Sequence, residues 1–141
     1  MNDKAFFDTN VLVYAFDKRE PEKQAIAKQL LRDFGSEGRL VLSTQVLQEL
    51  YVTLTKMGKQ VLSSEDAEEI VNDFAEYPLV QVDRMVIAAA MKRHQSKAFS
   101  FWDSLIVEAA LQANCSVLFS EDMQDSRQIG QLVIRNPFKM G

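Results

Sequence analysis

The chain has 141 residues and a formal net charge of −4, and it contains a single cysteine. Its length suits one domain with its own core, so we expect a single domain over residues 1–141. The hydrophobic share of 47% and the charged share of 26% are those of a folded globular protein. No apolar run approaches the roughly 18 residues of a membrane span, and the N-terminus does not look like a signal peptide, so we expect a cytoplasmic protein without membrane contact.

The first half of the chain alternates short apolar runs with amphipathic segments. The run at 5–7 predicts a buried strand, and a helical pattern follows it within a couple of residues. Pro21 suits a first helical turn, and Gly35 ends the apolar stripe that follows it. A second strand is predicted at 40–42. The next helical stripe stops near Gly58 and consists of Val46, Leu50, Leu54 and Met57.

The second half continues the alternation. Ser63 and Asp66 form a capping box that opens a helix ending before Pro78. Short apolar strands joined by helices predict an α/β fold, with a parallel sheet covered on both faces. The further strands are predicted at 79–82, 117–119 and 132–134, and the further helices at 84–95 and 101–114.

Cys115 is the only cysteine, so no internal disulfide and no thiolate zinc site can form within the chain. We expect it to be a small buried hydrophobic residue.

Asp8 directly follows the first predicted strand. In parallel sheets, ligands bind beyond the carboxyl ends of the strands, so this is a ligand position. The plainer interpretation is that Asp8 or Thr9 only caps the helix that follows.

Two further acids lie on predicted helices. Glu49 flanks the apolar stripe of its helix and could point along the edge of the sheet, although a solvated role is the alternative. Asp103 shares a stripe with apolar residues three, four and seven positions on, so it should face other groups. Ser100 and Asp103 also fit a capping box, and the two roles are compatible.

A last group of acids follows the strand at 117–119. Ser120 comes first, and Glu121, Asp122 and Asp125 come next. They could form an ordinary acidic loop, and spacing alone does not decide which of the three faces inward.

An α/β topology would bring the ends of the first and fourth strands and two neighbouring helices to one cleft. Several ionised carboxylates gathered there would raise one another's pKa unless a cation neutralised them. Oxygen ligands without Cys or His suit Mg²⁺ or Mn²⁺ and disfavour zinc. Such ions can polarise a phosphodiester and activate a water molecule.

Several motifs resemble those of one family in the same order along the chain. The run Phe-Asp-Thr-Asn-Val-Leu at 7–12 resembles the opening motif of PIN domains, particularly the VapC-type toxins of bacterial toxin–antitoxin pairs. The similarity continues at Glu49, at Phe-Trp-Asp-Ser-Leu-Ile (101–106), at Ser-Glu-Asp-Met-Gln (120–124) and at Asn-Pro-Phe (136–138). It therefore spans almost the whole chain.

The resemblance implies a three-layer α/β/α sandwich with a central parallel sheet and a magnesium-dependent endoribonuclease, with Mn²⁺ as a substitute. It further implies an RNA substrate, a cognate antitoxin as partner and a homodimer. By matching position, it assigns catalytic and metal-binding roles to Asp8, Glu49, Asp103 and Asp122. Asn10, Ser120 and Asp125 are expected as supporting residues.

Other classes fit less well. A phosphoacceptor receiver domain would have adjacent acids after the first strand, and a haloacid-dehalogenase-type phosphatase would have an acid where Asn10 stands. The stronger alternative is a PIN-like domain that binds RNA or protein without cleaving. Neither the RNA target nor the number of metal ions can be read from the sequence.

The remaining aromatic and basic residues carry weaker signals. We expect Trp102 to pack in the core, although it could stack on a base. His94, the only histidine, is expected at a solvated helix end. Lys18, Arg19, Lys56 and Lys59 could contact phosphates, but scattered basic residues are commonly surface groups.

Overall fold

The computed structural model describes residues 3–56 and 62–139. Its strands are β1 (Ala5–Phe7), β2 (Leu40–Ser43), β3 (Leu79–Val80), β4 (Val117–Phe119), β5 (Gln128–Ile129) and β6 (Leu132–Arg135). Its helices are α1 (Thr9–Tyr14), α2 (Pro21–Gly35), α3 (Thr44–Leu54), α4 (Ser64–Phe74), α5 (Arg84–Gln95), α6 (Phe101–Gln112) and the 3-10 turn η2 (Pro137–Lys139). Met57, Gly58 and Lys59 lie outside the described residues.

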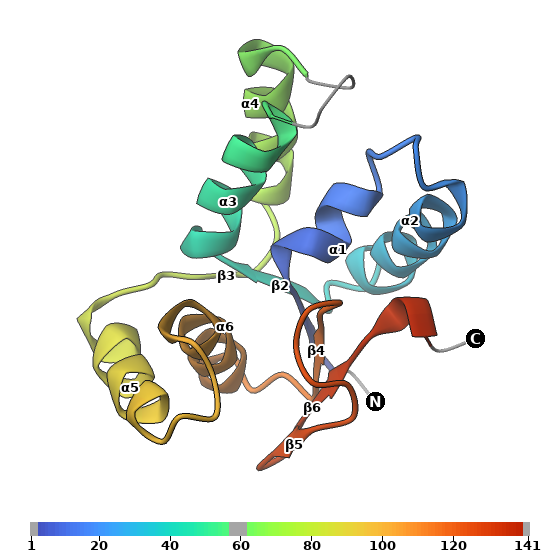
Figure 1. Ribbon diagram of the computed structural model, residues 1–141. Helices are drawn as coiled ribbons and strands as arrows, with labels where there is room; N and C mark the ends of the chain where they lie inside the picture. Colours follow the sequence, from blue (N-terminus) through green and yellow to red (C-terminus); the bar gives the residue numbers. More distant parts are fainter. Residues whose placement is uncertain (1–2, 57–61, 140–141) are drawn as a thin grey trace.

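The strands form one sheet in the order β3-β2-β1-β4-β6-β5, in which β5 alone is antiparallel to its neighbour. Helix α2 lies on one face, and α6 covers the other with α5 packed against it (Figure 1). The pair α3 and α4 rises beyond the end of the central strands. The predicted α/β/α sandwich with a mostly parallel central sheet is thus confirmed.

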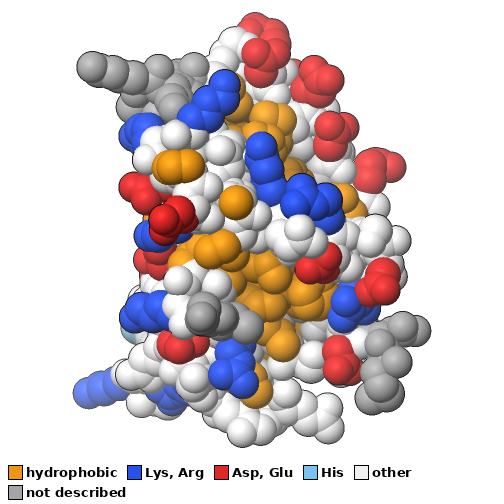
Figure 2. Space-filling view, turned by 90° about the vertical axis from the view of Figure 1, so that its right-hand side faces the viewer, with side chains coloured by type: hydrophobic (Ala, Val, Ile, Leu, Met, Phe, Trp, Pro, Cys, Tyr) orange, Lys and Arg blue, Asp and Glu red, His pale blue; other side chains and the backbone are white. Residues whose placement is uncertain are grey.

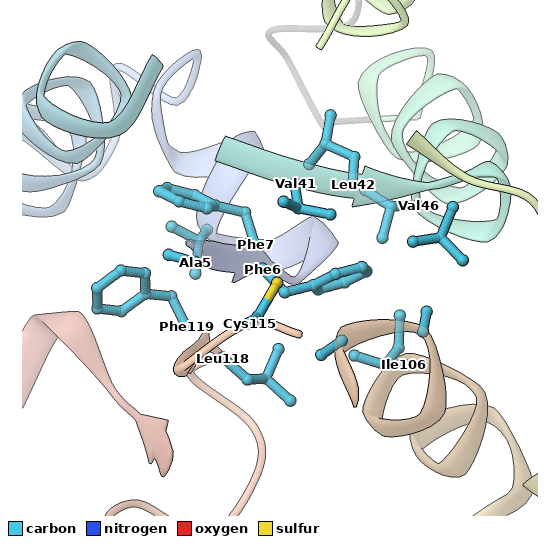
Figure 3. Close-up of a cluster of buried hydrophobic side chains, with 14 of the residues drawn as sticks. Ala5, Phe6, Phe7, Val41, Leu42, Val46, Ile106, Cys115, Leu118 and Phe119 are labelled. Atoms are coloured by element: carbon cyan, nitrogen blue, oxygen red, sulfur yellow. The ribbon is translucent and has the colours of Figure 1, made fainter. Parts of the chain in front are cut away.

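The core is built from strands that are buried on both faces. Phe6 and Phe7 are fully buried and point to opposite sides of the sheet (Figure 3). Phe7 packs edge-on against Phe34 of α2, with ring centroids 5.8 Å apart. On the other side lies Ile106 of α6. Cys115 is also buried, as expected, and burial raises the pKa of its thiol to about 12.

Capping side chains fix where several helices begin. The Ser63 hydroxyl accepts from the Asp66 amide at 3.1 Å, and the Ser100 hydroxyl accepts from the Asp103 amide at 3.1 Å. Both serines had been predicted as caps, and Pro21 opens α2 as expected. Such side chains satisfy amides that would otherwise lack partners in the first turn.

Two features of the sheet differ from the prediction. Strand β3 ends at Val80, because the amide of Val82 turns away to the Thr44 hydroxyl at 3.0 Å. Strand β5 was missed. It is a two-residue edge strand that folds back on β6 through Gly130, whose positive φ of 60° favours glycine.

Across the two described stretches, no helix is both long and apolar enough to cross a bilayer.

Candidate active site

The centre of the site is Asp8, at the point where the strand order of the sheet reverses. Strand β1 lies between β2 and β4, and parallel α/β sheets bind ligands where their order reverses. Asp8 is 8% exposed and caps α1, accepting from the Thr9 amide at 2.8 Å. Its other oxygen, Oδ2, accepts from the Ser120 hydroxyl at 2.9 Å. Phe7 of β1 pairs with Phe119 of β4. The residues that follow them, Asp8 and Ser120, therefore lie side by side.

Asn10 and Ser120 connect Asp8 to the acidic loop after β4. The Asn10 amide nitrogen donates to Asp122 Oδ2 at 3.0 Å and lies 3.5 Å from Asp8 Oδ2. Its oxygen accepts from the Glu121 amide at 3.2 Å, and the Ser120 hydroxyl accepts from the Asp122 amide at 3.3 Å. These contacts hold the Asp122 carboxylate beside Asp8.

Glu49 approaches from α3 and is held by two residues that the sequence analysis did not assign to the site. The Thr9 hydroxyl donates to Glu49 Oε1 at 2.6 Å, and Gln45 donates to Oε2 at 3.2 Å. Gln45 is buried and also donates to the backbone carbonyl of Trp102 at 3.3 Å. Gln45 stands four residues before Glu49, a helical spacing that could have identified it.

Asp103 enters from the first turn of α6, which is opened by Ser100. It is partly buried and lines the same cleft as Asp8, Glu49 and Asp122. The cleft is open and has a volume of about 780 Å³.

Asp8 and Asp103 have raised pKa values, and the charges of neighbouring acids contribute to both. Burial raises the pKa of Asp8 to about 6, against the opposing hydrogen bonds from Ser120 and Thr9. The negative charges of Glu49 and Asp103 add to that rise. The pKa of Asp103 is also raised, first by burial and then by the charges of Asp122 and Glu49, while its contact with Ser100 opposes the rise.

The other two acids of the β4 loop have different surroundings. Glu121 accepts from the Tyr14 hydroxyl at 2.7 Å and pairs with Lys23 at 2.6 Å. Burial opposes ionisation of Glu121, but these two partners outweigh it and lower its pKa. Asp125 accepts from the Asn136 amide at 2.8 Å and so fixes the loop. Of the three candidate carboxylates, that of Asp122 is the one hydrogen-bonded to Asn10 beside Asp8.

The donor set suits a hard divalent ion. Its ligand atoms are carboxylate oxygens, and a cation would offset both the burial of Asp8 and Asp103 and the smaller repulsion from their acidic neighbours. No three His, Cys, Asp or Glu side chains of residues 3–56 and 62–139 converge closely enough to hold one ion together.

Two expectations for nearby residues have different outcomes. Trp102 does not pack in the core, because it is 64% exposed. It stands in the first turn of α6, where its indole meets the Phe101 ring in a T-shaped arrangement with centroids 5.3 Å apart. His94 is exposed near the end of α5, as expected.

Comparison with solved structures finds the same fold in toxin–antitoxin proteins. A toxin–antitoxin complex from Klebsiella pneumoniae matches with a TM-score of 0.67 at 18% identity, covering 92% of this chain and 96% of that one. DNA-bound VapBC from Salmonella typhimurium matches with a TM-score of 0.66 at 16% identity, covering 94% and 97%. VapC20 of Mycobacterium tuberculosis, a toxin that cleaves the sarcin–ricin loop, matches with a TM-score of 0.61 at 18% identity, covering 84% and 92%.

Comparison by sequence gives the family. No curated protein matches the chain. The family model of the PIN domain matches residues 5–128, which include Asp8, Glu49, Asp103 and Asp122. The chain therefore belongs to the PIN domain family.

Proposed function

We propose that this protein is a divalent-metal-dependent endoribonuclease, with Mg²⁺ as its ion and Mn²⁺ as a substitute. The observation that carries the proposal is the buried Asp8 carboxylate, which faces three further acids from α3, α6 and the β4 loop. Burying a carboxylate among others is unfavourable unless a cation compensates it. Such a cluster is difficult to explain by stability alone.

In this proposal, Asp8, Glu49, Asp103 and Asp122 hold the ion between them, partly through its water ligands. The hydrogen bonds from Ser120 and Thr9 fix the direction of the Asp8 carboxylate, and Asn10 fixes Asp122 beside it. When bound, a divalent ion supplies Lewis acidity toward the phosphate and lowers the pKa of a water molecule. The open cleft admits an extended RNA strand, which a closed pocket would exclude.

The solved relatives suggest the biological setting. Two of them are described as toxin–antitoxin or VapBC complexes, and a third as a toxin that cleaves an RNA loop. We propose that this chain is likewise the toxin of a type II toxin–antitoxin pair, acts on RNA in the cytoplasm, forms a homodimer and is inhibited by a cognate antitoxin.

The direct test is cleavage of mixed cellular RNA by purified protein in Mg²⁺, Mn²⁺ or chelator. Asp8→Asn and Asp103→Asn should abolish cleavage while the circular dichroism spectrum stays unchanged. Fragment ends from the wild-type reaction would then map the target. Full cleavage in chelator, or in both variants, would overturn the proposal.

The alternative is a PIN-like domain that binds RNA or protein without cleaving. One observation favours it, since the acids do not converge as a ready-made ion site within the described residues. It predicts RNA or protein binding without any metal-dependent cleavage in the same experiment.

A further inference from the structure

The cleft contains one basic side chain among its described lining residues, that of Arg19. Six acids share this lining: Asp8, Asp17, Glu49, Asp103, Glu121 and Asp122. An RNA phosphate entering such a cleft meets a negative potential, even when a divalent ion offsets part of it. A correctly placed basic side chain would therefore contribute more to RNA binding here than on an ordinary protein surface.

On the α2 side of the molecule, no continuous basic surface supplies such a side chain. Lys and Arg side chains on the α2 side of the molecule are scattered among acidic and hydrophobic ones, without a continuous basic stripe (Figure 2). With a net charge of −4, we expect individual contacts to matter in RNA binding by this chain.

Arg19 is held in a fixed orientation by Asp17. Its Nε donates to Asp17 Oδ1 at 2.9 Å, and its Nη2 donates to Oδ2 at 3.0 Å. The Arg19 backbone amide donates to the same carboxylate at 3.0 Å. The Asp17 side chain is 7% exposed, whereas that of Arg19 is 51% exposed. A buried acid thus anchors a guanidinium group that faces the cleft.

This pairing uses one edge of the guanidinium plane. Arginine has five N–H donors, and the contacts to Asp17 occupy Nε and one proton of Nη2. The outer edge, formed by Nη1 and the second proton of Nη2, has the spacing that binds two phosphate oxygens.

Building on the proposed nuclease function, we propose that Arg19 binds a backbone phosphate of single-stranded RNA beside the acidic site, with Asp17 as its positioning residue. The ligand class is a phosphodiester, recognised by two charge-assisted hydrogen bonds and independent of base identity.

The test is the salt dependence of RNA binding. Binding of a short fluorescein-labelled single-stranded RNA is measured in Mg²⁺ by fluorescence anisotropy, in an Asp8→Asn background that prevents cleavage. Arg19→Gln should weaken binding about tenfold, as expected for a lost hydrogen bond to a charged group. It should also reduce the slope of log K against log salt by about 0.7, the contribution of one phosphate contact to single-stranded nucleic acid.

Two further variants separate a phosphate contact from a general change in charge. Arg32→Gln removes the same charge from an exposed site on α2 outside the cleft lining and should leave the slope unchanged. Arg19→Lys keeps the charge but not the planar fork, so it should keep most of the slope while binding more weakly than arginine. Equal slopes for Arg19→Gln and Arg32→Gln would overturn the proposal, as would no RNA binding by the Asp8→Asn parent.

Failure of this inference can be distinguished from failure of the proposed nuclease. If wild-type protein cleaves RNA with metal and Arg19→Gln has the same KM, Arg19 is not a substrate contact but the nuclease stands. If no metal-dependent cleavage occurs and the slope still falls with Arg19→Gln, the phosphate contact stands and the nuclease proposal is overturned.

Discussion

The Thr9 hydroxyl donates a 2.6 Å hydrogen bond to Glu49 Oε1, although the two residues are 40 positions apart. Thr9 is 8% exposed and belongs to the first turn of α1, while Glu49 belongs to α3. The bond thus ties the helix after Asp8 to the helix that brings the second acid. It fixes both the packing of α1 on α3 and the direction of the Glu49 carboxylate.

Replacing Thr9 with valine should weaken both the packing of α1 on α3 and the orientation of the Glu49 carboxylate. The change keeps the shape but removes the donor, so the free energy of unfolding should fall by about 1–2 kcal/mol. Mn²⁺ affinity should fall about tenfold or more, because Glu49 loses the group that orients it. Denaturant unfolding and calorimetric Mn²⁺ titration measure the two effects. Thr9→Ser keeps the hydroxyl and should stay close to wild type in both, and equal behaviour of the two variants would contradict this role.

Asp8 should make the metal-free protein less stable as the pH rises. Its folded-state pKa of about 6 lies above its ordinary value of 3.8, so the folded state binds the proton more tightly than the unfolded chain. Ionised Asp8 therefore opposes folding by about 3 kcal/mol at pH well above 6, and this penalty disappears as the pH falls below 3.8.

Asp8→Asn removes that penalty and should stabilise the protein in chelator by about 1–3 kcal/mol at neutral or higher pH. The difference between variant and wild type should shrink as the pH is lowered through 6. Urea unfolding of both proteins across this range is the measurement. A variant that is less stable than wild type at every pH would contradict the proposed environment of Asp8.

The three acids of the β4 loop should respond differently to neutralisation. Asp122→Asn should lower metal-dependent RNA cleavage at least tenfold, because this carboxylate is held beside Asp8 by Asn10. Glu121→Gln should retain cleavage, since Glu121 pairs with Lys23 and Tyr14. Cleavage rates of the two variants, measured with the same metal ion at the same concentration, test which acid of the loop belongs to the site. Loss of cleavage in Glu121→Gln with retention in Asp122→Asn would reverse the assignment.

Trp102 offers a spectroscopic check, because it is the only tryptophan. At 64% exposure, its fluorescence should resemble that of indole in water and should be quenched readily by acrylamide. Trp102→Phe should leave the free energy of unfolding within about 0.5 kcal/mol, as for other surface changes. A blue-shifted emission that resists quenching would mean that the ring is buried.

The sequence predicted the strand that positions Asp8 because local signals agreed there. Residues 5–7 are apolar throughout, and the acid follows them directly, so burial and the carboxyl end of the strand coincide. The caps at Ser63 and Ser100 were predictable for the same reason, since a cap depends on residues only three positions apart.

Features that depend on distant partners could not be predicted in this way. Glu121 and Lys23 are 98 positions apart, and no local pattern indicates that they pair. Strand β5 was missed for another reason: its partner β6 is close in sequence, but two residues are too few to show a strand pattern. The prediction that Trp102 packs in the core was wrong, because the sequence does not show which side of the first turn of α6 meets solvent, and the ring is 64% exposed.

The central claim is that acids from four separate segments hold one metal site. Calorimetric titration with Mn²⁺ of the wild type and of Asp8→Asn, Glu49→Gln, Asp103→Asn and Asp122→Asn tests it most directly. Glu69→Gln, which neutralises an exposed acid on α4, is the matched control. The account predicts that each of the four variants weakens Mn²⁺ binding about tenfold or more while the control binds like wild type. Equal Mn²⁺ affinity in all six proteins would contradict it.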